Sequence, residues 1–97
     1  MSVTVLLTAQ VKPNKEEEFK TFVAKCLKET RLYDGFINIE IYEDKITKGS
    51  FVFYEKWVNI KAYEAYLSWR TEQGVMDEIG AMLTTAPVIT YYDLVDI

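Results

Sequence analysis

The sequence predicts one α+β domain over residues 1–97, of the ferredoxin-like split βαβ type with a four-stranded antiparallel sheet. Two observations predict this class. Segments in which apolar and polar residues alternate, as along strands, lie between segments in which apolar residues recur at helical spacing. Their order is strand, helix, strand, strand, helix or pair of helices, and strand, so we expect the helices to cover one sheet face.

The first strand and the first helix are predicted on either side of Pro13. Residues 2–11 alternate, and proline ends the strand because it has no N–H to donate. Asn14 and Glu17 have the spacing of a capping box, and the acidic residues 16–18 suit the positive end of a helix. Apolar side chains then follow at helical spacing: Phe19, Phe22, Val23, Cys26 and Leu27.

Two antiparallel strands are predicted on either side of a turn at residues 48–50. The earlier strand, Phe36–Glu43, follows Gly35 and places its isoleucines on one face: Ile37, Ile39 and Ile41. In the later strand, alternation puts three aromatic residues and one carboxylate on a single face: Phe51, Phe53, Glu55 and Trp57.

The later strand runs directly into a helix near Asn59. Residues 68–71 offer a break and a new cap, after which the helical period continues to Leu83 despite two glycines. Residues 88–95 are β-branched and aromatic and predict the last strand. If the helix folds back over the sheet, Trp57 and Tyr63 bracket a space that has the Glu55 carboxylate as its floor.

The composition excludes several classes of protein. The net charge is −4 and no basic stripe appears, which argues against a nucleic-acid partner. No apolar run reaches the roughly 20 residues that a membrane span needs. The single Cys26 cannot form an internal disulfide, no signal peptide is recognisable, and we expect a cytoplasmic protein. Histidine is absent and no metal-ligand spacing occurs, so no metal site is predicted.

A homodimer is predicted from the face of the sheet that the helices leave open. Three of the strands carry large apolar or aromatic residues on both faces. An uncovered apolar face needs a partner, and we expect a second copy to bury residues such as Val52, Tyr54 and Val58.

The segment that begins with Glu55-x-Trp57 and continues through Asn59 and Ala62-Tyr63 resembles the signature of the antibiotic biosynthesis monooxygenase superfamily. Residues 11–15, Gly35 and Pro87 extend the resemblance over nearly the whole chain. The resemblance implies a dimeric α+β barrel. It also implies oxidation of a planar phenolic, polyketide or quinol-like molecule by O2, without a cofactor.

In the cofactor-independent oxygenases of this family, a pocket Trp and a Tyr six residues later take part in catalysis, which implies such roles for Trp57 and Tyr63. This chain also departs from the family. Phe53 stands where those oxygenases carry an Asn, and Tyr66 and Arg70 stand where quinol-type relatives often carry His. These departures favour a second interpretation, a non-catalytic protein that binds or carries a small molecule in the same barrel.

Glu55 is the candidate base, because desolvation on an apolar face favours the protonated carboxyl and moves its pKa toward neutrality. Its alternative role is to accept hydrogen bonds that hold the helix on the sheet. Arg31 and Arg70 could anchor an anion, although surface salt bridges are the use we expect of them. The side chains expected to contact an aromatic substrate are Leu7, Phe22, Phe53, Tyr66 and Trp69.

Overall fold

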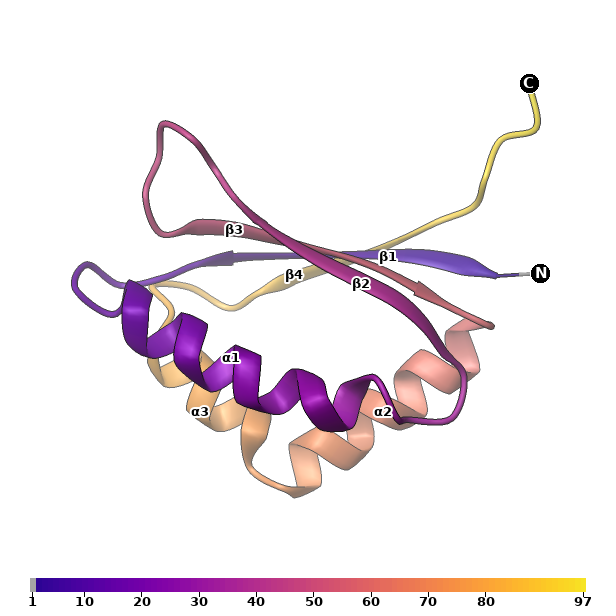
Figure 1. Ribbon diagram of the computed structural model, residues 1–97, viewed down its shortest axis with the longest axis horizontal. Helices are drawn as coiled ribbons and strands as arrows, with labels where there is room; N and C mark the ends of the chain where they lie inside the picture. Colours follow the sequence, from indigo (N-terminus) through magenta and orange to yellow (C-terminus); the bar gives the residue numbers. More distant parts are fainter. Residues whose placement is uncertain (1) are drawn as a thin grey trace.

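The computed structural model describes residues 2–97 and confirms the predicted α+β class. A four-stranded antiparallel sheet has the order β2-β3-β1-β4, and the helices lie together on one of its faces (Figure 1). The elements are β1 (Val3–Gln10), α1 (Glu16–Thr30), β2 (Phe36–Glu43), β3 (Ser50–Trp57), α2 (Ile60–Glu72), α3 (Val75–Ala81) and β4 (Val88–Tyr92). No helix within residues 2–97 is long and apolar enough to cross a membrane.

The centre of the sheet is formed by β1 and β3, whose register decides which side chains meet beneath the helices. Val5 lies opposite Glu55, and Leu7 lies opposite Phe53. Since side chains alternate along a strand, these four share the face that the helices cover, and all four are buried. The predicted face of β3 is therefore the face toward the helices.

The prediction of which β2 side chains share one face is wrong at the start of the strand. The pairing with β3 shifts between Phe36 and Asn38, which is a bulge, so the alternation of the strand is reset there. Phe36 consequently packs edge-on against Trp57 at a centroid distance of 5.5 Å, while Ile37 is exposed. Ile39 and Ile41 keep their inward positions.

The predicted capping box of α1 does not form. Asn14 has a φ of 69°, in the left-handed region, and turns the chain before the helix starts. The N-cap position falls on Lys15, whose side chain makes no capping hydrogen bond. The start of α2 follows the prediction, because the Asn59 side chain accepts a hydrogen bond from the Ala62 N–H at 2.8 Å.

The break in the second helical region lies later than predicted. Helix α2 continues through residues 68–71, where the Thr71 hydroxyl donates to the Leu67 carbonyl at 2.8 Å and makes no cap. The chain turns at Gly74, whose φ of 81° suits a residue without Cβ, and α3 begins after it. The last strand also ends earlier than predicted, at Tyr92.

Candidate functional site

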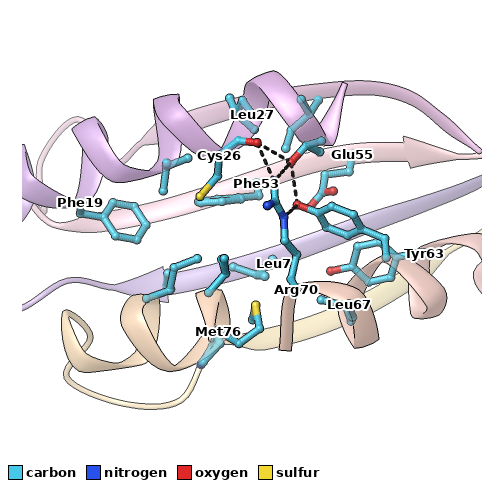
Figure 2. A pocket seen from close by; sticks show the side chains of 18 residues that line it. Leu7, Phe19, Cys26, Leu27, Phe53, Glu55, Tyr63, Leu67, Arg70 and Met76 are labelled. Carbon is cyan, nitrogen blue, oxygen red and sulfur yellow. Dashed lines mark hydrogen bonds between the residues drawn. The ribbon is translucent and has the colours of Figure 1, made fainter. Parts of the chain in front are cut away.

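A small cavity of about 50 Å³ lies between the inner face of the sheet and the three helices (Figure 2). Most of its wall is aliphatic or aromatic, with contributions from β1, β2, β3 and all three helices. The wall also contains a small set of polar or ionisable side chains: Cys26, Thr30, Glu55, Tyr63, Tyr66 and Arg70. An enclosed apolar space with few polar groups is the usual form of a small-molecule site.

Glu55 reaches this cavity from the middle of β3 and is only 3% exposed. Burial disfavours the charged carboxylate and raises its pKa to about 7, against a smaller opposing effect of a hydrogen bond from Trp57. The Trp57 indole Nε1–H donates to Glu55 Oε1 at 3.0 Å. The carboxyl can therefore exist in either protonation state near neutral pH, as a general base requires.

Trp57 and Tyr63 do not bracket an empty space. Their ring centroids are 5.6 Å apart in edge contact, and Trp57 is fully buried outside the cavity wall. The indole N–H is already donated to Glu55, so it does not point at a ligand. Tyr63 does line the cavity, and burial together with Glu55 raises the pKa of its phenol, which keeps the hydroxyl protonated.

The residues predicted to contact a substrate fall into two groups. Leu7, Phe53 and Tyr66 line the cavity. Phe22 lies instead in surface clefts beside α3, and Trp69 packs against the Tyr33 ring at a centroid distance of 5.1 Å. Neither Phe22 nor Trp69 belongs to the cavity wall.

Arg70 is the residue whose position the sequence did not predict. It forms the expected salt bridge, with the exposed Glu29 at 3.3 Å, but its own side chain is only 2% exposed and its guanidinium lies at the cavity wall. Tyr63, Tyr66 and Arg70 are spaced i, i+3 and i+7, so they share one face of α2. That spacing is the signal that could have placed Arg70 inside, whereas Arg31 is exposed as expected.

A second, more open cleft of about 250 Å³ lies on the outside of this wall, between α1 and the joint of α2 and α3. The cavity and the cleft share three residues, Cys26, Arg70 and Val75. Only a thin layer of side chains therefore separates the inner cavity from the surface at this point.

The donor set gives no indication of a metal centre within residues 2–97, where no three His, Cys, Asp or Glu side chains lie close enough to share an ion. The ionisable groups that the cavity wall offers are one carboxyl, one thiol, two phenols and one guanidinium.

Comparison with known proteins gives a consistent fold. The sequence model of the family described as antibiotic biosynthesis monooxygenase matches residues 2–73. An uncharacterised protein of Synechocystis is 34% identical over 62 residues, which are 64% of this chain but only 42% of that protein. The present chain thus matches less than half the length of that curated relative.

Solved structures of several similar proteins superpose on the chain. The crystal structure of a protein described as an antibiotic biosynthesis monooxygenase has a TM-score of 0.87 at 18% identity, covering 97% of this chain and 99% of the other. A variant of SnoaB, a cofactor-independent oxygenase from Streptomyces nogalater, has a TM-score of 0.85 at 16% identity, with coverages of 99% and 95%. A conserved protein from Methanosarcina mazei has a TM-score of 0.86 at 20% identity, covering 95% of this chain and 91% of the other. At these identities the likeness concerns the fold.

Proposed function

Because this chain belongs to the antibiotic biosynthesis monooxygenase family, we propose that it oxidises a small phenolic, polyketide or quinol-like molecule with O2, without a cofactor. The observation that carries this proposal is Glu55, a nearly fully buried carboxyl with a pKa of about 7 in an otherwise apolar cavity. Such a group is costly to bury, and its tuned pKa is what proton abstraction near neutral pH requires.

The chemistry begins with removal of a proton from the substrate. Glu55 takes the phenolic proton, and the electron pair stays on the substrate as an electron-rich anion. That anion reacts with O2, so that one oxygen atom enters the ring as the second quinone oxygen and the other leaves as water. The apolar wall excludes solvent from the anion, and Tyr63 supplies a neutral hydroxyl that can donate a hydrogen bond.

Substrate entry requires the cavity to widen, because ligand pockets usually measure about 300–1,000 Å³ and this one holds about 50 Å³. Helix α3 is the part of the wall best suited to move, since none of its residues is buried and it follows the turn at Gly74. Displacing Val75 away from Cys26 would join the cavity to the 250 Å³ cleft.

The open face of the sheet supports the homodimer as part of this proposal. Val52 and Tyr54 are half-buried in one copy, while Val88 and Tyr92 are exposed; Val58 lies instead beside Gly35 and the start of α2. A second copy packed on the open face removes the side chains there from water.

The alternative function, a small-molecule binding or carrier protein, is favoured by two observations at the same site. Phe53 presents no polar group to the cavity, and the Trp57 N–H is held by Glu55 rather than free for a substrate. A binder of this kind takes up its ligand to saturation and consumes no O2.

An oxygen electrode separates the two functions. The protein is mixed with a panel of small phenols and hydroquinones under air, and Trp fluorescence is recorded in parallel to follow binding. Glu55→Gln removes the base while keeping the shape, and Glu64→Gln removes an exposed carboxylate of α2 as the matched control. If the protein is the proposed enzyme, we expect O2 uptake by the wild type and by Glu64→Gln, and none by Glu55→Gln. Saturable binding without uptake overturns the enzyme in favour of the carrier.

A further inference from the structure

Every hydrogen-bond donor of the Arg70 guanidinium has a partner within the protein. Its Nε–H donates to the Tyr66 hydroxyl at 3.1 Å, and one terminal nitrogen donates to Glu29 at 3.3 Å and to Gln73 at 3.2 Å. The other terminal nitrogen donates to the Cys26 carbonyl at 2.6 Å and to Thr30 Oγ1 at 3.1 Å (Figure 2). A guanidinium has five N–H groups, and all five are engaged.

The positive charge of Arg70 therefore acts on a ligand through the groups that it holds. Two of these groups are hydroxyls of the cavity wall: the Tyr66 phenol, which accepts from Arg70 Nε, and Thr30, which accepts from a terminal nitrogen. The Glu29 carboxylate, the ionic partner of Arg70, is 62% exposed and lies on the side of the outer cleft. Water screens that pair, so it neutralises the guanidinium only partly on the cavity side.

The proton of Tyr66 has two arrangements. Tyr66 and Thr30 hydroxyl oxygens are 2.6 Å apart, and either can be the donor. Thr30 also lies 3.2 Å from the Cys26 carbonyl, which offers its proton a second acceptor. When Thr30 donates to that carbonyl, Tyr66 donates to Thr30. When Thr30 turns its proton to Tyr66, the Tyr66 proton is available to another acceptor, such as a ligand in the cavity that Tyr66 lines.

The two charged groups of the wall act on different phenols. Glu55 acts electrostatically on Tyr63. Arg70 donates a hydrogen bond to the Tyr66 hydroxyl. The Cys26 thiol, whose pKa burial raises, stays neutral. An oxyanion in this apolar space is most stable beside the Tyr66 hydroxyl.

We propose that Tyr66, positioned by Arg70 and Thr30, is the oxyanion-binding group of this cavity, and that its ligand is an acidic phenol or enol bound in ionised form. That the ligand is a ring compound rests on the proposed function. The new parts of the assignment are that the ligand binds as an anion and that Tyr66 selects it. Arg70 is a positioning residue in this arrangement, since it touches the ligand only through Tyr66.

The test uses 4-nitrophenol, whose phenolate alone is yellow and whose electron-poor ring resists oxidation, with 4-nitroanisole as the ring that cannot ionise. Both are titrated at a pH below 7, where the Glu55 carboxyl is largely protonated. Wild type should bind nitrophenol as the yellow phenolate, with an apparent pKa about one to two units below that of the free compound, the shift that one charge-assisted hydrogen bond supports.

Tyr66→Phe keeps the ring and removes the hydroxyl. It should lose about 10- to 100-fold in affinity for nitrophenolate while binding nitroanisole within about twofold of wild type. Tyr33→Phe is the matched control, because Tyr33 packs on Tyr66 at 5.4 Å but lies outside the cavity wall. A series of phenols of decreasing pKa on wild type gives the same answer without any variant, since tighter binding of the more acidic phenols is expected.

Three outcomes overturn the assignment. Nitrophenol could bind in its colourless form, Tyr63→Phe could lose affinity for nitrophenolate while Tyr66→Phe keeps it, or neither probe could bind. The proposed oxidation fails separately. If nitrophenolate binding depends on Tyr66 but no phenol supports O2 uptake, the proposed oxidation is refuted and the oxyanion site stands. If O2 is consumed but nitrophenol binds as the neutral phenol, only the oxyanion site is refuted.

Discussion

Trp57 and Glu55 lie two residues apart on the same face of β3, and the indole N–H of Trp57 donates to the Glu55 carboxyl at 3.0 Å. The bond fixes the carboxyl at the cavity wall and opposes the effect of burial on its pKa. The fully buried tryptophan thus acts on the chemistry of the site without touching the cavity.

Trp57→Phe should raise the pKa of Glu55 above its value of about 7, because the hydrogen bond that favours the ionised form is lost. The variant should also lose about 1–3 kcal/mol of stability, since a large buried ring is shortened and a buried carboxyl loses its donor. NMR titration of the Glu55 side-chain carboxyl carbon and urea unfolding measure the two effects. An unchanged pKa would show that the bond does not control the carboxyl.

The free energy of unfolding should decrease as the pH rises from about 4.5 to about 7, because Glu55 loses its proton in the unfolded state over this range. Its folded pKa of about 7 lies above the ordinary 4.5, so the folded state holds a proton that the unfolded state releases in this window. The stabilisation is complete below pH 4.5 and lost above pH 7, and it amounts to about 3 kcal/mol. Urea unfolding across this range measures the slope.

Glu55→Gln should remove that slope, and the exposed Glu64→Gln should keep it. The carboxylates of Glu43 and Asp44 have pKa values below their ordinary ones, held down chiefly by backbone N–H groups. Their titration therefore affects stability below pH 4.5 and leaves the Glu55 window clear. A slope in Glu55→Gln equal to that of wild type would contradict the assignment.

Arg70→Lys should destabilise the fold by about 2–4 kcal/mol, because an ammonium cannot replace five N–H groups, three of which join the end of α1 to α2. Arg31→Lys, at an exposed position, should change stability by less than about 0.5 kcal/mol. Urea unfolding of both variants is the measurement. Equal stabilities would mean that the guanidinium network contributes nothing.

Cys26 should report on the opening of the cavity. It is the only cysteine, it lies in the layer between cavity and cleft, and burial raises the pKa of its thiol. Reaction with an aromatic disulfide reagent should therefore be slow and should slow further when a phenol fills the cavity. Gly80→Ala, which favours the helical form of α3 by about 0.5–1 kcal/mol, should slow labelling if α3 must unwind to open.

The open sheet face should hold two copies together. Tyr54→Arg places a charge among half-buried residues of the outer face of β3 and should turn a dimer into a monomer in light scattering. Glu64→Arg, on an exposed position of α2, should leave the mass unchanged. A wild-type monomer at the highest soluble concentration would contradict the proposed dimer.

The sequence by itself determined the class of fold and the face of β3, because alternation along a strand and helical spacing are local properties of the chain. The same alternation put Glu55 among apolar neighbours, so its raised pKa could be foreseen. Alternation failed at Phe36, where a bulge reset it. The capping-box spacing failed at Asn14, where the backbone is left-handed.

Only the tertiary structure decided the polar arrangement of the site. The partners of Arg70 on α1 lie 40 to 44 positions earlier in the chain, and no local pattern links such residues. Whether Trp57 faces a ligand or Glu55 likewise depends on how α2 packs on the sheet, because that packing brings the Tyr63 ring against the indole. Local spacing fixes which face a side chain occupies, and the packing of distant elements fixes what it meets there.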